Sequence, residues 1–230
     1  MDRRLKRIAI YGGTFDPVHV GHLQIAKQVL EVFEIDEVVF VPARRAPHKL
    51  ERPVTSPLHR YAMLALATQD NPRLKVSTFE LEAPDRQYTV DTLQFFQEHF
   101  GNLARLFFLM GADSWSEITS WREWKQLLSM ANHIVVTRPG FPMTFGHIAG
   151  NLAERIVDLQ GTSRRQILAA VDAAVDNRIF LTDIVGIDVA ATKIRQLARD
   201  SRKEELLSLV PAAVADYILK YSIYKNFDEA

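Results

Sequence analysis

Cysteine is absent from this sequence of 230 residues, which excludes disulfides, thiolate metal ligands and cysteine nucleophiles. An excess of charge is absent too, because 28 Lys and Arg residues balance 28 Asp and Glu residues. Proteins that bind nucleic acid without sequence preference are usually basic, so this balance argues against a nucleic-acid partner. It leaves room for a local anion site, since net charge does not describe a single pocket.

Long apolar runs are also missing from the sequence. No stretch approaches the roughly 18 apolar residues of a membrane-spanning helix, which argues against a membrane partner. The basic start of the chain is followed by a short apolar run, Ile8 to Tyr11, and a signal peptide needs a longer one. We therefore expect a soluble protein of the cytoplasm.

The composition is that of a globular protein, with 47% hydrophobic and 24% charged residues. Short apolar runs typical of strands cover 8–11, 38–41, 106–110, 133–137 and 179–182, and a further strand is expected at 74–79. Helical spacing covers 23–33, 58–68, 89–100, a tryptophan-rich stretch before 133, 163–175, 192–199 and 210–221. This alternation predicts an α/β fold with a doubly wound, mostly parallel open sheet and closing C-terminal helices.

The segment Gly12-Gly-Thr-Phe-Asp-Pro-Val-His-Val-Gly-His22 lies between the first strand and the first helix. Ligands of doubly wound sheets bind where such loops follow the strands. Adjacent glycines allow a bound group close to the backbone, and a helix that begins near Val18 offers its amides to an anion. His19 and His22 share a face of the first helical turn, where both can donate to a phosphate. A turn with two surface histidines is one alternative, and a metal site that lacks a third ligand is another.

This segment resembles the signature of the nucleotidyltransferases that carry a His-x-Gly-His motif. The resemblance implies a Rossmann-like fold and the transfer of a nucleoside monophosphate from ATP or CTP to a small acceptor. It implies that His19 and His22 contact the ATP phosphates, with His22 at the α-phosphate in the transition state. Mg²⁺ would be bound mainly through ATP oxygens. The backbone expected to hold the nucleotides is that of Gly12, Gly13, Thr14 and Phe15.

Further segments are similar to those of the bacterial nicotinate-nucleotide adenylyltransferases, namely 42–49, 88–93, 110–124, 137–140 and 214–224. One departure is Ala46, which replaces a proline. The resemblance implies adenylyl transfer from ATP to nicotinate mononucleotide, giving nicotinate adenine dinucleotide and pyrophosphate in NAD biosynthesis. Nicotinamide mononucleotide and phosphopantetheine stay open as acceptors. A nucleotide-binding regulatory protein with little turnover, and a homo-oligomer, also stay open.

The resemblance assigns the acceptor's phosphate to three basic residues, His48, Lys49 and Arg138. Solvated loop charge is the alternative for these residues. It assigns the nicotinate ring to Thr89 and Trp121.

Trp121 would stack on the ring, and backbone amides around Arg122 would bind the ring's carboxylate. The alternative is that Trp115, Trp121 and Trp124 are ordinary core aromatics, which spacing favours first for Trp115 and then for Trp124. Asp113 is expected either to bind the ATP ribose or to cap the helix that follows.

A late segment, Val189-Ala-Ala-Thr-Lys-Ile-Arg195, is similar to the family's second signature. Thr192 and Arg195 match it and are expected at the ATP triphosphate. Ala190 stands where the family has a serine, so one hydroxyl is missing near the phosphates. We expect a single nucleotidyltransferase domain over 1–230, with an insertion at 141–178 that is a lid, an oligomer contact or filler.

Overall fold

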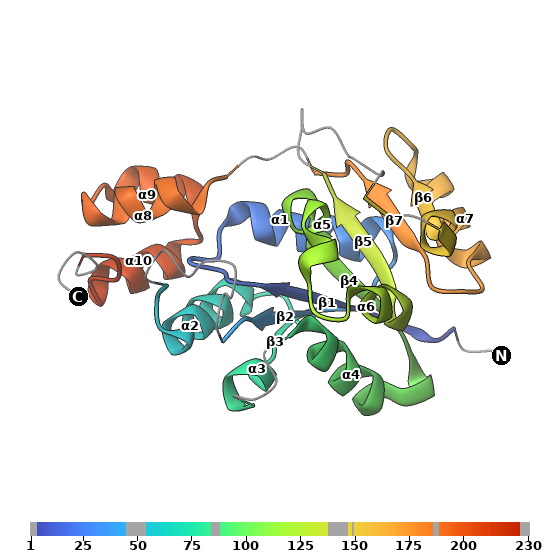
Figure 1. Cartoon of the computed structure of the whole chain (residues 1–230). Helices are drawn as coiled ribbons and strands as arrows, with labels where there is room; N and C mark the ends of the chain where they lie inside the picture. The colour runs from blue at the N-terminus through green and yellow to red at the C-terminus, as the bar shows by residue number, and fades with distance from the viewer. Residues whose placement is uncertain are drawn as a thin grey trace.

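The computed structural model describes residues 4–44, 54–83, 88–137, 147–148, 150–185 and 189–225. These residues form a seven-stranded sheet with helices on both faces (Figure 1). The strands are β1 (Lys6–Gly13), β2 (Glu37–Pro42), β3 (Leu74–Val76), β4 (Ala104–Gly111), β5 (Asn132–Val136), β6 (Ile156–Asp158) and β7 (Ile179–Thr182). All of the strand pairings are parallel, which confirms the predicted fold class.

Ten α-helices surround the sheet in the described part of the chain. They are α1 (Val20–Val32), α2 (Pro57–Thr68), α3 (Phe79–Glu82), α4 (Thr89–Phe100), α5 (Ala112–Ser116), α6 (Trp124–Met130), α7 (Arg164–Ala173), α8 (Ala191–Arg199), α9 (Lys203–Leu209) and α10 (Ala212–Lys220). Figure 1 shows α8, α9 and α10, in orange and red, gathered at one end of the sheet. In the described ranges, no helix combines the length and apolar character needed to cross a membrane.

Two hydrophobic cores form because side chains alternate between the faces of each strand. On β1, Ala9 and Tyr11 belong to the core under α1, α2 and α7 to α10. Ile8 and Ile10 belong to the opposite core, under α4, α5 and α6. A strand buried on both faces needs a continuous apolar run, which is why these strands were visible in the sequence.

The strand order, β3-β2-β1-β4-β5-β7-β6, fixes where a ligand can bind. The chain winds outward from β1 to β3 and then returns to β4 on the other side of β1. The loops that follow β1 and β4 therefore diverge and leave a crevice at the carboxyl ends of these strands. Gly13 ends β1 and Gly111 ends β4, so both glycines lie at that crevice.

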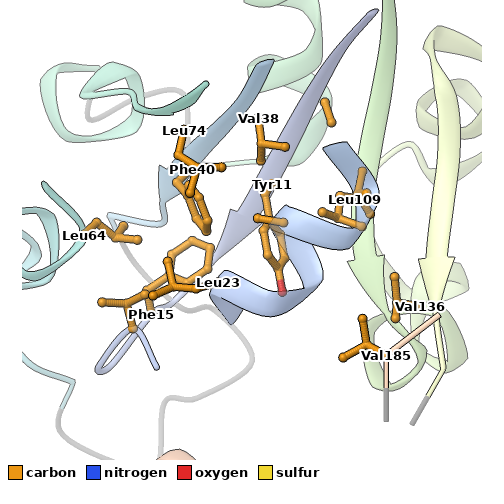
Figure 2. Packing of buried hydrophobic residues seen from close by; sticks show 14 of the residues in the cluster. Tyr11, Phe15, Leu23, Val38, Phe40, Leu64, Leu74, Leu109, Val136 and Val185 are labelled. Carbon is orange, nitrogen blue, oxygen red and sulfur yellow. The ribbon is translucent and has the colours of Figure 1, made fainter. Parts of the chain in front are cut away.

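The loop after β1 is anchored in the first core through Phe15 (Figure 2). The Phe15 ring packs 5.4 Å from both the Tyr11 and the Phe40 rings, measured between centroids. The Phe15 backbone has a φ of 49°, which is unfavourable for a bulky residue unless surrounding contacts hold it. The aromatic packing supplies those contacts.

The structure differs from the sequence predictions mainly in short elements. The predicted strand 74–79 ends at Val76, and Phe79 begins α3 instead. The tryptophan-rich stretch is two short helices, α5 and α6, rather than one. Strand β6 and helix α9 had not been predicted, because three and seven residues are too few to establish a period. Helix α1 begins at Val20 rather than near Val18, since His19 caps it.

Candidate active site

A cavity of about 590 Å³ lies at the crevice between β1 and β4. Its walls come from the loop after β1, the starts of α1 and α4, and the segment between β4 and α6. The sequence-predicted site residues that line it are Gly12, Gly13, Thr14, Phe15, His19, His22, Thr89, Asp113, Trp121 and Arg122. These residues are far apart in the chain, and the fold brings them to one cavity.

His19 and His22 form a stacked pair at the start of α1. Their ring centroids are 3.6 Å apart and the ring planes differ by 24°. The His22 backbone amide donates to His19 Nδ1 at 3.4 Å, and the His19 amide donates to His22 Nδ1 at 3.3 Å. A neutral imidazole that accepts at Nδ1 carries its proton on Nε2. Each ring therefore presents Nε2 as its hydrogen-bond donor, which suits an anionic ligand.

Three glycines make room for this arrangement. A Cβ on Gly13 would lie 2.9 Å from the Phe15 ring, and one on Gly12 would lie 3.3 Å from the Phe108 ring. A Cβ on Gly21 would lie 3.1 Å from His19 Nδ1. Side chains at these positions would crowd the Phe108 ring, the Phe15 ring or the histidine pair, so the glycines serve close packing.

The opposite wall carries the residues predicted to bind the acceptor's ring. Trp121 is partly buried, and its ring meets the edge of Phe108 at 6.4 Å between centroids. The Arg122 guanidinium lies 4.8 Å from the centre of the Tyr88 ring. Thr89 is the first residue of α4. This wall combines an aromatic surface with a cation, a pairing that suits a planar acidic ring.

The other tryptophans and Asp113 have separate places. Trp115 is buried in the second core, as spacing favoured, whereas Trp124 is partly buried beneath Lys125. Gly111, not Asp113, is the N-cap of α5, so Asp113 does not have the capping role considered from the sequence. Asp113 instead lies in the first turn of α5, exposed on the cavity wall.

Thr192 and Arg195 lie beside the cavity and do not line it. Arg195 Nη1 donates to the Asp16 carbonyl at 2.8 Å, and Nη2 donates to Thr192 Oγ1 at 3.1 Å. Arg195 thus connects α8 to the loop after β1. Ala190 is the N-cap of α8 and makes no side-chain cap. The predicted acceptor residues His48, Lys49 and Arg138 lie outside the described residues.

Glu80, which the sequence did not single out, also lines the cavity. Thr92 Oγ1 donates to its carboxylate at 2.7 Å. Burial raises the pKa of Glu80 to about 7, and the hydrogen bonds to Thr92 and to the Arg44 backbone act in the opposite direction. The strand predicted from the sequence ends at Phe79, directly before Glu80, and no pattern in the sequence points to a buried carboxylate there.

Comparisons with known proteins show the family of this chain. A family model described as cytidylyltransferase-like matches residues 10–197. A probable nicotinate-nucleotide adenylyltransferase from Thermoanaerobacter sp. is 36% identical over 229 residues, covering 100% of this chain and 99% of that protein. The corresponding protein from Mycolicibacterium vanbaalenii is 35% identical over 227 residues, covering 99% and 96%.

The fold also has a counterpart among solved structures. The Plasmodium falciparum nicotinic acid mononucleotide adenylyltransferase complexed with NaAD superposes with a TM-score of 0.70 at 21% identity, covering 96% of this chain and 98% of that one. At that identity the likeness concerns the fold, whereas the relatives match in sequence over nearly their whole length. This chain belongs to the nicotinate-nucleotide adenylyltransferases, within the cytidylyltransferase-like family.

Proposed function

We propose that this protein transfers the adenylyl group of ATP to nicotinate mononucleotide, in NAD biosynthesis. The products are nicotinate adenine dinucleotide and pyrophosphate. The observation that carries the proposal is the position of the His19–His22 pair in the same cavity as Trp121 and Arg122. The full-length match to nicotinate-nucleotide adenylyltransferases supports it.

The reaction needs no nucleophile from the enzyme. An oxygen of the mononucleotide phosphate forms a bond to the α-phosphorus of ATP, and the bond from that phosphorus to the bridging oxygen breaks. Pyrophosphate leaves with the electron pair. Catalysis then rests on aligning the two phosphates and on stabilising the charge that develops on them.

The histidine pair is suited to that second task. His22 Nε2 donates to the α-phosphate in the transition state, and His19 Nε2 donates to a neighbouring phosphate oxygen. Their Nδ1 atoms are held by backbone amides, so neither ring has to reorient during the reaction. Donors fixed before the charge develops are the most effective electrostatic catalysts.

The acceptor occupies the opposite wall of the cavity. Trp121 stacks on the nicotinate ring beside Thr89, and the backbone amides around Arg122 bind its carboxylate. His48, Lys49 and Arg138 hold the mononucleotide phosphate, and Asp113 binds the ATP ribose. Thr192 and Arg195 act on the triphosphate from α8, next to the loop that Arg195 contacts.

Mg²⁺ is proposed to bind through the phosphates of ATP. In the described ranges, no group of three or more His, Asp or Glu side chains gathers as a metal site. A hard cation that keeps most of its waters needs few protein ligands when phosphate oxygens are present. When bound, it neutralises charge on the triphosphate.

Pyrophosphate release in the presence of ATP and Mg²⁺ tests the proposal. We expect release that depends on nicotinate mononucleotide and that yields equal amounts of dinucleotide and pyrophosphate. If product forms only with phosphopantetheine, or only with nicotinamide mononucleotide, that compound is the acceptor and nicotinate mononucleotide is not. Tight ATP binding without turnover on any of the three acceptors would identify a regulatory nucleotide-binding protein instead.

A further inference from the structure

Arg60 is a buried arginine that donates hydrogen bonds to backbone carbonyls. It lies on α2, and 1% of its surface is exposed. Its Nε donates to the Thr55 carbonyl at 2.9 Å and Nη1 donates to the Thr14 carbonyl at 2.7 Å. Its Nη2 donates to the carbonyls of Ala43 at 2.6 Å and Arg44 at 3.4 Å. One guanidinium therefore joins three separate segments of the chain.

Two of those segments are walls of the active-site cavity. Thr14 and Ala43 both line it, whereas Arg60 itself does not. The Ala43 amide also donates to the Gly13 carbonyl at 2.9 Å, so the loops after β1 and β2 are joined directly as well. Within the described ranges the acceptors of Arg60 are carbonyl oxygens rather than carboxylates. Burying a cation is costly: desolvation lowers the pKa of Arg60, and the nearby Asp16, Tyr224 and Glu80 act in the opposite direction.

The bond to Thr14 sets the direction of the next amide. In a planar trans peptide the carbonyl and the amide N–H point in opposite directions. Arg60 holds the Thr14 carbonyl, so the N–H of Phe15 points away from Arg60. The positive φ of Phe15 belongs to the same turn, and a residue in that conformation needs outside contacts to stay there.

The bond to Ala43 acts on a second peptide in the same way. The Ala43 carbonyl and the Arg44 amide belong to this one peptide. Arg60 donates to the carbonyl, and the amide on the other side donates to Glu80. Glu80 is in turn held by Thr92 on α4. The peptide that leads from β2 into the loop expected to bind the acceptor's phosphate is therefore held between two buried side chains, Arg60 and Glu80.

We propose that Arg60 is a positioning residue for adenylyl transfer, which fixes the Phe15 amide and the exit of β2 so that the two reacting phosphates are aligned. The inference rests on the proposed function. It requires a guanidinium in particular, because the planar fork reaches three carbonyl directions at once and a lysine ammonium on a single stem does not.

The chain offers a matched control in Arg155. Its Nε donates to the Asn177 carbonyl at 2.7 Å and its Nη2 to the Leu128 carbonyl at 2.8 Å. None of these three residues lines the cavity. Replacing Arg155 with Ala thus removes hydrogen bonds to backbone carbonyls away from the cavity, where we expect an effect on folding alone.

The experiment compares Arg60→Lys, Arg60→Ala and Arg155→Ala with the wild type. Binding of a non-hydrolysable ATP analogue, measured by calorimetry, counts the competent sites, and kcat is expressed per such site. We expect both Ala variants to melt at lower temperature. The Arg60 variants should lose about 10- to 100-fold in kcat, the cost of misaligned reactants, while the KM for ATP changes less. Arg155→Ala should keep the wild-type kcat per site.

Rescue of kcat by added guanidinium ion is a second measurement, and it would not change if Arg60 had only a folding role. Well below denaturing concentrations, the ion should restore part of the kcat of Arg60→Ala and leave Arg155→Ala unchanged. Wild-type kcat in Arg60→Lys, or equal losses per site in Arg60→Ala and Arg155→Ala, would overturn the inference. If Arg60→Ala does not fold, Arg60→Lys alone decides. Failure of the proposed function would appear in the wild type, as no dinucleotide from nicotinate mononucleotide.

Discussion

The two walls of the cavity differ in how firmly the protein holds them. The wall after β1 is buried: Phe15 is 3% exposed and His19 is 8% exposed. Arg60 donates a hydrogen bond to the Thr14 carbonyl in this wall, and the Phe15 ring packs against Phe40 in the core. We call this the braced wall. The opposite wall is more open, with Tyr88 40% exposed and held to an exposed Arg122 by a cation–π contact.

This contrast matches the two tasks of the proposed reaction. Stabilising charge on the phosphates requires donors that do not move, so it suits the braced wall. Admitting and releasing the acceptor requires a surface that adjusts, so it suits the open wall. The braced wall should therefore govern kcat, and the open wall should govern the KM and the choice of acceptor.

The largest effect is expected from the braced wall, at His22. Replacing His22 with Ala removes one preorganised donor, which should lower kcat on the order of 10²–10³-fold. ATP affinity, measured by titration with a non-hydrolysable analogue, should change much less. A variant with near wild-type kcat would mean that the stacked pair only caps α1, and the assignment of catalysis to this wall would fail.

Lowering the pH should decrease the free energy of unfolding, through His133 in the core beneath the open wall. This histidine is fully buried beside Phe108, the ring against which Trp121 packs. Burial lowers the pKa of His133 to about 3. Between about pH 6.5 and about pH 3 the unfolded state therefore binds a proton at His133 that the folded state does not bind. The free energy of unfolding falls as the pH drops from about 6.5 towards 3. At pH 5 the loss should be about 2 kcal/mol.

Urea unfolding at pH 7 and pH 5 measures this loss, with His133→Leu as the non-titrating comparison. Glu80 acts with the opposite sign, because its raised pKa favours the folded state as the pH falls from about 7 to 4.5. The informative quantity is therefore the difference between the two proteins. The same pH dependence in both would show that His133 does not titrate on unfolding.

A smaller effect is expected on the open wall, at Trp121. Removing its ring should raise the KM for nicotinate mononucleotide about tenfold, the equivalent of one aromatic stacking contact, with little change in kcat. Trp124→Ala is the control, because Trp124 is also partly buried and does not line the cavity. Equal KM changes in the two variants would indicate a general loosening of the tryptophan segment.

The smallest effect concerns Ala190, at the edge of the braced wall. Because Ala190 is the N-cap of α8 and forms no side-chain cap, Ala190→Ser should add one. Such a cap is worth about 0.5–2 kcal/mol, a rise of a few degrees in melting temperature for a chain of this size. Calorimetric scans of both proteins measure it. An unchanged melting temperature combined with tighter ATP binding would instead place the new hydroxyl at the phosphates.

The sequence predicted the long elements well, because their periods are long enough to recognise. Helix α4 has the predicted bounds, and the buried strands appear as continuous apolar runs. The tryptophan segment was predicted less well, because its helices α5 and α6 have five and seven residues, which is too short to establish a period.

Side-chain roles that depend on distant partners were not visible in the sequence. Arg60 donates a hydrogen bond to the carbonyl of Thr14, 46 positions away along the chain, and the local sequence of α2 does not indicate this hydrogen bond. Glu80 follows the predicted strand 74–79, and its partner Thr92 lies 12 positions further along the chain. The roles of His48, Lys49 and Arg138, the single domain with its insertion at 141–178, the cytoplasmic location and the oligomeric state stay predictions.

A competition between two acceptors tests the division between the walls most directly. Equal concentrations of nicotinate and nicotinamide mononucleotide are offered with ATP and Mg²⁺, and the ratio of the two dinucleotide products is measured. We expect a ratio of at least about 10 to 1 for the nicotinate product in the wild type, a difference of roughly 1.4 kcal/mol. His22→Ala should keep that ratio at a much lower rate. Trp121→Ala should bring it towards 1 to 1, because without the stacking contact the ring's carboxylate is no longer held against the amides around Arg122. Equal products from the wild type, or a ratio that collapses in His22→Ala and survives in Trp121→Ala, would contradict the account.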